Sequence, residues 1–328
     1  MGLYTATLAM ETGRRGPVKR RKATVAAGIA PPPRVDGRVP GRYDSPFRVK
    51  SAPESRPDAR SMNPAFRLHC LERDSTNLGF LKYRDYQGFL VTGQHSGTHW
   101  IKWMLSLAIA EAYGVPPPRY YNNASSNDLI GHPKHPRPHP AAPRIASTHT
   151  IPPTALDWKW VRALLPVPPY AVVVRDIRDV LISNYEKWIG VRYHVPFSEY
   201  LKGDISQKKY VCDVWWYVHF MNRWGRVAEL YPEETLVLRY EDFRADPRAN
   251  LERLARHFGL ELPAAALDKG VAGGTKEAML AHHDPSVKER PVRLEGHGEA
   301  RFTEADTALL KDILRENLKY DFGYDFGL

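Results

Sequence analysis

The sequence predicts an α/β domain in which helices flank a central parallel sheet. Several short runs are apolar at nearly every position, for example residues 170–174 (YAVVV), as is typical of strands buried on both faces. These runs alternate with longer stretches that have the 3.6-residue apolar period of helices. Strands that alternate with helices form parallel sheets, and such sheets bind ligands at the carboxyl ends of their strands.

The predicted elements follow one another from residue 88 onward. The strands cover residues 88–92, 144–147, 170–174 and 235–239. The helices cover residues 98–113, 208–230, 247–258 and 303–318. A further helix begins after Asp176, which can cap it, and carries Val180, Leu181 and Tyr185. A loop rich in Pro and His, residues 114–143, separates the first helix from the second strand.

Residues 1–61 differ in composition from the rest of the chain. They are rich in Arg, Pro, Gly and Ala without a sustained apolar period, which predicts a disordered basic tail ahead of one domain over residues 62–328. The tail holds 13 of the 47 Lys+Arg and 5 of the 37 Asp+Glu, a balance of +8, which leaves 34 against 32, or +2, for the domain. A nearly neutral domain argues against nucleic-acid binding. Any basic surface on it must be local, such as a pocket for a phosphorylated nucleotide.

Cysteine usage and hydropathy bear on the location of the protein. Cys70 and Cys212 are too few and too far apart for a disulfide framework, which favours a reducing compartment. No apolar run reaches the roughly 18–20 residues that a membrane-spanning helix needs. We therefore expect a cytoplasmic protein. The arginines of the tail leave a transit peptide, and with it an organelle stroma or matrix, as the alternative.

The first candidate site is the segment of residues 92–100 (TGQHSGTHW). It leads from a predicted buried strand through a glycine-containing turn into a helix, so backbone N–H groups and the positive helix end surround one point. Gly97 would let the backbone approach an anion closely. The Walker A pattern is not met, because no Gly-Lys-Ser/Thr follows at the required spacing. The segment indicates a phosphate or sulfate site, with an ordinary strand-to-helix turn as the alternative.

Arg175 and Ser183 form the second candidate site. Arg175 follows the strand 170–174, so we expect it at the same edge of the sheet as the first segment, and Ser183 lies about two helical turns further along. Together they could hold one phosphate, with a bidentate contact from the Arg. The alternative is a surface Arg and a solvent-facing Ser.

Taken in order, these segments resemble the sulfotransferases that use 3′-phosphoadenosine 5′-phosphosulfate (PAPS). Residues 95–100 (HSGTHW) are similar to the family's KSGTTW loop, and Arg175 with Ser183 matches the family's Arg and Ser in spacing. Further similar segments are residues 147–152 (STHTIP), 216–219 (WYVH) with Trp224, 240–243 (YEDF) and 292–303. The resemblance extends from about residue 86 to the end of the sequence.

The resemblance implies a three-layer fold like that of the P-loop NTPases. It also implies transfer of a sulfuryl group from PAPS to an acceptor hydroxyl or amine without a metal ion. His149 would be the general base, Trp100 would stack on adenine, and Arg175, Ser183 and Arg293 would bind the 3′-phosphate. The acceptor would be a small molecule, a lipid or a carbohydrate, and the oligomeric state is left open. The implied PAPS-binding residues are His95, Ser96, Gly97, Thr98, His99, Trp100, Arg175, Ser183, Tyr240, Arg293 and Gly296.

Several positions depart from the family pattern. His95 stands where the family has a Lys that contacts the leaving oxygen, Ser147 stands where it has another Lys, and residues 273–275 replace its adenine-side segment. We predict that His95 is catalytic: a bound anion would raise its pKa, so that an imidazolium replaces the Lys. The alternative is that His95 only hydrogen-bonds the phosphate. These departures leave a nucleotide-binding pseudoenzyme and a kinase-like phosphotransferase as alternative functions.

Three histidines, His132, His135 and His139, lie in the loop 114–143. Histidines are common metal ligands, so a metal site is one interpretation. Prolines extend this stretch, however, and residues 131–139 contain no Cys or carboxylate. We expect instead that the loop covers the acceptor pocket, because it connects the first candidate site with the segment that carries His149.

Overall fold

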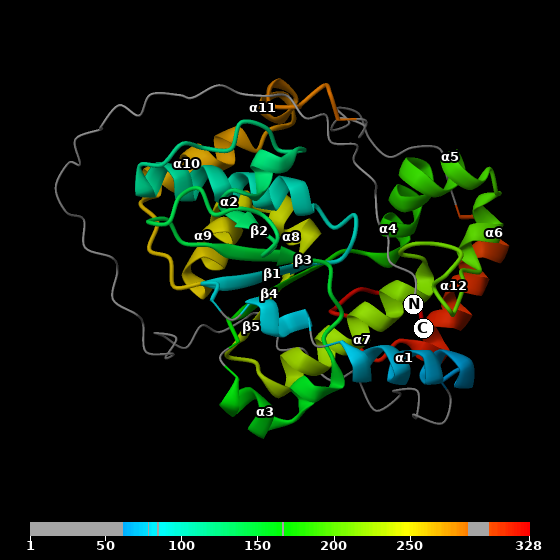
Figure 1. Cartoon of the computed structure of the whole chain (residues 1–328). Coiled ribbons are helices and arrows are strands. Elements are labelled where there is room, and N and C mark those ends of the chain that lie inside the picture. The colour runs from blue at the N-terminus through cyan, green and yellow to red at the C-terminus, as the bar shows by residue number, and fades with distance from the viewer. Residues whose placement is uncertain (1–61, 78, 84, 166, 288–301) are drawn as a thin grey trace, which may run out of the picture. The chain divides into compact units, whose positions relative to one another are not determined.

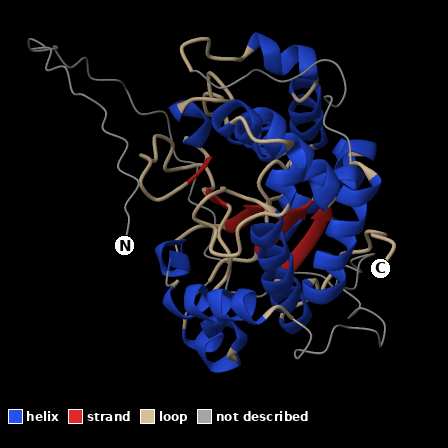
Figure 2. Ribbon diagram, turned by 90° about the vertical axis from the view of Figure 1, so that its right-hand side faces the viewer, coloured by secondary structure: helices blue, strands red, loops and turns tan. Residues whose placement is uncertain are grey.

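A central parallel sheet organises the part of the chain that the computed structural model describes, residues 62–77, 79–83, 85–165, 167–287 and 302–328. Its strand order is β2-β3-β1-β4-β5, and every neighbouring pair is parallel. Helices cover both faces of the sheet (Figure 1, Figure 2). The predicted three-layer α/β fold is therefore confirmed. The strands are β1 (Gly88–Thr92), β2 (Ile130–Gly131), β3 (Ile145–Thr148), β4 (Tyr170–Val174) and β5 (Thr235–Arg239).

Helices connect the strands and flank the sheet. A π-helical turn, Tyr185–Ile189, continues α4 directly into α5. The helices are α1 (Pro64–Thr76), α2 (Thr98–Tyr113), α3 (Lys159–Leu164), α4 (Ile177–Asn184), α5 (Gly190–Tyr193), α6 (Phe197–Leu201), α7 (Val214–Leu230), α8 (Tyr240–Ala245), α9 (Pro247–His257), α10 (Ala264–Gly273), α11 (Lys276–Ala281) and α12 (Glu304–Asn317).

Alternating side chains on the strands enter two separate cores. On β4, Ala171 and Val173 pack into a core with α2, α9 and α10. Tyr170, Val172 and Val174 pack on the opposite face with α1, α7 and α12. All five side chains are buried. The near-continuous apolar run of residues 170–174 is thus a strand covered on both faces, as predicted.

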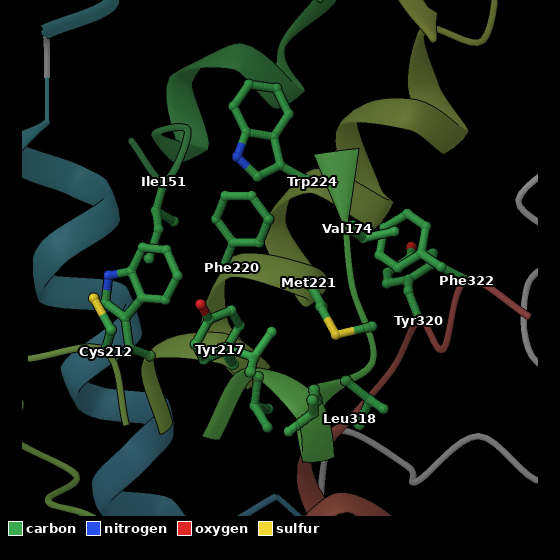
Figure 3. Packing of buried hydrophobic residues seen from close by; sticks show 14 of the residues in the cluster. Ile151, Val174, Cys212, Tyr217, Phe220, Met221, Trp224, Leu318, Tyr320 and Phe322 are labelled. Carbon is green, nitrogen blue, oxygen red and sulfur yellow. The ribbon is translucent and has the colours of Figure 1, made fainter. Parts of the chain in front are cut away.

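The second core also fixes the segment that follows β3. Phe220 and Trp224 of α7 lie in this core, beside Ile151 (Figure 3). The indole Nε1 of Trp224 donates a hydrogen bond to the backbone carbonyl of Thr150 (2.9 Å). The aromatic packing of α7 therefore holds the backbone next to His149 in place.

Three neighbouring strands end side by side at the carboxyl edge of the sheet. The register pairs Val91 with Thr148 and Thr92 with Val173, so the segments after β1, β3 and β4 begin at the same level. From β1 the chain first builds β2 and β3 on one side and then crosses to β4 on the other. Such a reversal leaves a crevice between the diverging loops, which is where open α/β sheets bind ligands.

The helix predicted over residues 208–230 begins later, at residue 214. The carboxylate of Asp204 accepts a hydrogen bond from the backbone N–H of Lys208 (2.8 Å), which holds the preceding stretch in a turn. Asp213 then caps α7 by accepting from the N–H of Trp216 (3.1 Å). An apolar period does not reveal such side-chain-to-backbone bonds, which compete with helix formation. Several further elements were not predicted, among them α1, α10 and β2, which lies within the loop 114–143.

Some predictions concern residues outside the described ranges. The basic tail of residues 1–61, and with it the domain boundary at residue 61, stays a prediction, as do the roles of Arg293 and Gly296. Among the described residues, no helix combines the length and the apolar character needed to cross a membrane. Cys70 and Cys212 are both free thiols, and Cys212 is buried.

Candidate active site

The segment after β1 makes a tight turn into α2. His95 and Gly97 both have positive φ angles, +60° and +81°, in a region that glycine adopts freely and histidine more readily than most residues. A Cβ atom on Gly97 would lie 2.6 Å from Cε2 of Tyr240, so the glycine also permits close packing of this ring. Gly97 is the N-cap of α2 and contributes no side-chain cap. The N–H groups of the first helical turn thus remain suited to an anion.

His149 directly follows β3, and β1 fixes the orientation of its ring. Its Nδ1 atom lies 2.8 Å from the carbonyl oxygen of Thr92 and 3.2 Å from the Thr92 hydroxyl. A carbonyl only accepts, so Nδ1 carries the proton and Nε2 carries the lone pair that a general base needs. Burial lowers the pKa of His149, which favours the neutral ring. The Thr92 hydroxyl also lies 2.6 Å from that of Thr98, at the start of α2.

Arg175 and Ser183 both contact His95. Arg175 donates from Nη1 to the backbone carbonyl of His95 (3.0 Å), and its Nη2 pairs with Asp179 (3.1 Å). Its guanidinium lies over the ring of Tyr240, 4.7 Å from the centroid. The Ser183 hydroxyl lies 3.4 Å from Nδ1 of His95. The structure therefore brings the two candidate segments of the sequence together.

Two buried polar atoms at this junction have no hydrogen-bond partner among the described residues. They are the hydroxyl oxygen of Ser96, whose side chain is fully buried, and Nε of Arg175. Buried polar groups are normally hydrogen-bonded, because leaving them without a partner is unfavourable. A hydroxyl and a guanidinium N–H are both able to donate, so this pair fits an anion with acceptor oxygens.

A cavity of about 620 Å³ opens at this edge of the sheet and is within the size range of ligand sites. Trp100 forms part of its wall: the indole Nε1 donates to the carbonyl of Gly274 (2.8 Å), and the ring meets Tyr240 edge-on. Among the described residues, the other predicted ones, Ser96, Arg175 and Ser183, are not in the lining. The predicted residues that line the cavity are His95, Gly97, Thr98, His99, Trp100, His149 and Tyr240.

Three cations in the cavity wall were missed from the sequence. Lys187, Arg244 and Lys276 line the cavity, whereas none of its described lining residues is a carboxylate. A signal was available for two of them. Lys187 lies four residues after Ser183, and Arg244 lies four residues after Tyr240, which is the spacing that places side chains on one face of a helix. The cavity is the local basic surface that the near-neutral domain led us to expect.

The surroundings of His95 favour its neutral form. Burial lowers the pKa of His95 to about 4, and the positive charge of Lys187 is the second cause. The ring Nε2 lies 3.0 Å from Oδ1 of Asn184. The protein itself thus shifts the pKa in the direction opposite to the one that a catalytic imidazolium requires. Lys187 lines the same cavity as His95, and its positive charge contributes to this shift.

The loop 114–143 contacts the site through Tyr121, whose carbonyl lies 3.3 Å from Nδ1 of His99. Arg144 holds the histidine stretch by donating to the carbonyls of His132 (3.2 Å) and His135 (2.7 Å). The loop was expected to cover the acceptor pocket, but it lines neither this cavity nor a second cavity beside α1 and α7. Within the described ranges, no group of three or more His, Cys, Asp or Glu side chains is placed to hold a metal ion.

Similar solved structures include mouse sulfotransferase SULT7A1 complexed with PAP. It is 17% identical, with 75% of this chain and 90% of that chain covered and a TM-score of 0.49. Retinol dehydratase in complex with androsterone and inactive cofactor PAP is 18% identical, with 72% and 82% covered and a TM-score of 0.46.

Curated relatives and a family model also match the chain. Sulfotransferase 1A1 of Bos taurus is 27% identical over 168 residues, 49% of this chain and 52% of the relative. Sulfotransferase 1A1 of Canis lupus familiaris is 25% identical over 138 residues, 39% and 41% of the two chains. The matches thus span about half the length of these relatives or less. The model of the sulfotransferase domain matches residues 85–283, more than half of the sequence, and the chain therefore belongs to the sulfotransferase family.

Proposed function

We propose that the protein is an enzyme that transfers a sulfuryl group from PAPS to an acceptor hydroxyl or amine. The observation that carries the proposal is the cavity at the carboxyl edge of the sheet. Lys187, Arg244 and Lys276 line it, its described lining holds no carboxylate, and His149 stands in its wall. PAPS carries a phosphosulfate and a 3′-phosphate, so a cation-lined cavity at the start of a helix favours its binding.

The first turn of α2 would hold the phosphosulfate. Backbone N–H groups of this turn are aligned with the positive end of the helix. The partnerless hydroxyl of Ser96 supports this assignment, because an acceptor oxygen would satisfy it. The donors that we assign to the phosphosulfate are Ser96, Gly97, Thr98 and His99, with neutral His95 as a further hydrogen-bonding group.

Arg175 and Ser183 would hold the 3′-phosphate, and the partnerless Nε of Arg175 supports this role. Trp100 and Tyr240 would hold the adenine side, since both line the cavity with their rings in contact. Arg293 and Gly296 keep their predicted roles in nucleotide binding.

His149 would act as the general base. Its Nδ1–H is held by Thr92, so Nε2 accepts the proton of the acceptor hydroxyl as the acceptor oxygen forms its bond to sulfur. The bond between sulfur and the phosphate oxygen breaks, and its electron pair stays on that oxygen as the product PAP leaves.

Lys187 would offset the charge that develops on the departing phosphate oxygen. It lines the same cavity as His95 and His149, and its charge acts on His95. A preorganised cation at such a position stabilises a transition state in which negative charge grows. In this proposal Lys187 takes the role that the sequence had suggested for an imidazolium at His95.

Calorimetry and radiolabelled transfer test the proposed function together. PAP should bind far more tightly than ATP with Mg²⁺, and radiolabelled PAPS should yield a sulfated acceptor. Tighter binding of ATP with Mg²⁺ would favour a kinase-like phosphotransferase. PAP binding without transfer to any acceptor would favour the nucleotide-binding pseudoenzyme. A cytoplasmic location stays a prediction.

A further inference from the structure

A second cavity, of about 320 Å³, reaches His149 from the side of α1 and α7. His149 is the residue that it shares with the larger cavity among the described residues. One imidazole thus stands between two spaces at the same edge of the sheet. The lining of the second cavity includes Arg73, Asp74 and Asn77 from the α1 region and Trp216 and His219 from α7.

The wall of the second cavity is charged even where it is buried. Asp74 is 6% exposed and His219 is 1% exposed. His219 donates from Nε2 to Oδ1 of Asp74 (2.8 Å), and Nε of Arg223 lies 3.3 Å from Oδ2 of the same carboxylate. Both carboxylate oxygens are therefore fixed in position. His219 Nδ1 is buried and has no hydrogen-bond partner among the described residues.

We propose that this second cavity is the acceptor site and that it takes a compact polyol, such as a sugar ring, in preference to an apolar alcohol. The inference rests on the proposed function. An apolar group entering the cavity would strip water from Arg73 and Asp74 without replacing the hydrogen bonds. A ring with several hydroxyls replaces them, while its C–H face packs on the aromatic wall formed by Trp216.

The geometry also orients the reacting hydroxyl. The polar side chains lie on α1 and α7, and His149 lies between them and the cation-lined cavity. A polyol bound by its outer hydroxyls therefore presents another hydroxyl to Nε2 of His149. That hydroxyl gives its proton to Nε2 and its oxygen bonds to the sulfur of PAPS. The bond from sulfur to the phosphate oxygen breaks, and PAP leaves with the electron pair.

Acceptor preference tests the inference with matched probes. Cyclohexanol and myo-inositol share a six-membered carbon ring and differ in their hydroxyls, and methyl hexopyranosides extend the set. With radiolabelled PAPS, at least one polyol should exceed cyclohexanol in kcat/KM by at least about a hundredfold, because sites built around hydroxyls discriminate strongly. A polyol with several equivalent hydroxyls gains in kcat/KM only by about the number of those hydroxyls, which is far less than a hundredfold.

Two variants on α1 link this preference to the cavity. Arg73 is exposed on α1 and lines the cavity, whereas Arg67 is exposed on the same helix and does not line it. Arg73→Met should raise KM for the polyol by about tenfold or more while the Kd for PAP stays unchanged. Arg67→Met should leave both constants unchanged, and Arg73→Lys should recover part of the loss.

The outcomes separate the two proposals. Three results overturn the polyol site. The first is a kcat/KM for cyclohexanol that equals or exceeds that of the polyols, and the second is no transfer to any polyol by protein that binds PAP. The third is a KM for the polyol that is the same in Arg73→Met and Arg67→Met. Failure to bind PAP at all contradicts the proposed function itself. Equal melting temperatures of the two methionine variants show that a difference between them does not arise from misfolding.

Discussion

The Nδ1 atom of His149 lies 2.8 Å from the carbonyl oxygen of Thr92. This contact ties the end of β3 to the end of β1 and sets the tautomer of the imidazole. Because Nδ1 carries the proton, Nε2 is the basic atom. The ring that is oriented in this way borders both the cation-lined cavity and the polar cavity.

The acid limb of the pH–rate profile should report His149. Burial lowers its pKa from the usual 6.5, and only the neutral ring acts as a base. Activity should therefore persist below pH 6.5 and fall only as the pH drops through this lowered value. We expect the acid limb of kcat to lie below pH 6.5 and to coincide with the titration of the His149 ring when that titration is followed by NMR. A limb above pH 6.5 would argue against His149 as the titrating base.

Arg175 should account for the preference for a 3′-phosphate. An Arg–phosphate contact in a crevice contributes about 1.5–3 kcal/mol, on the order of ten- to a hundredfold in Kd. By calorimetry, PAP should bind more tightly than ADP by this factor, and Arg175→Ala should remove most of the difference. Arg178→Ala, at an exposed arginine that pairs with Asp176, is the matched control. Equal binding of PAP and ADP by the native protein would contradict the assignment.

Gly97→Ala should impair folding and nucleotide binding more than Gly114→Ala. Both glycines have positive φ, so both variants carry a similar backbone cost of roughly 1–2 kcal/mol. Only the Cβ at position 97 meets a neighbour, 2.6 Å from the Tyr240 ring, whereas nothing lies within 4 Å of a Cβ at position 114. Melting temperature and PAP affinity measure the difference. Two variants with equal losses would show that the packing against Tyr240 is unimportant.

Much of the fold could be predicted because its information is local. A buried parallel strand is apolar throughout, and β1, β4 and β5 lie at the predicted residues 88–92, 170–174 and 235–239. The ends of the predicted strands are also visible in the sequence, because polar residues begin there. The predicted residues His95, His149 and Arg175 follow such ends, and the structure places all three at one edge of the sheet.

The remainder of the site depends on packing between distant segments. Asp74 and His219 form the buried pair of the second cavity, although 145 positions separate them in the sequence. Nothing near Asp74 indicates which helix will cover it. Similarly, Lys276 directly follows residues 273–275, which depart from the family pattern and so give no sign of a cation there, and the packing of α10 on α2 brings this part of the chain to the cavity. The direction in which the pKa of His95 shifts depends on the burial of its ring, which the motif does not reveal.

Lys187→Met should lower kcat by on the order of 10²–10³ at neutral pH, because a cation beside the leaving oxygen is lost. It should also raise the pKa of His95, measured by NMR, since a neighbouring positive charge is removed. Lys208→Met, at an exposed position, should change neither quantity.

His95→Lys separates the two candidate cations. If Lys187 is the cation, this substitution should leave the alkaline limb of kcat in place, because the buried ring of His95 is already neutral in the native enzyme. An alkaline limb that moves to higher pH in His95→Lys, together with full activity in Lys187→Met, would return the role to His95.

The most direct test of the central claim is the rate of sulfuryl transfer in His149→Ala, measured with radiolabelled PAPS beside the Kd for PAP. Losing a general base typically costs about 10²–10⁴ in rate, so turnover should fall by this factor while PAP affinity is retained. His282→Ala, at an exposed histidine, should retain full turnover. Turnover in His149→Ala equal to that of the native protein would contradict the proposal that this imidazole accepts the proton.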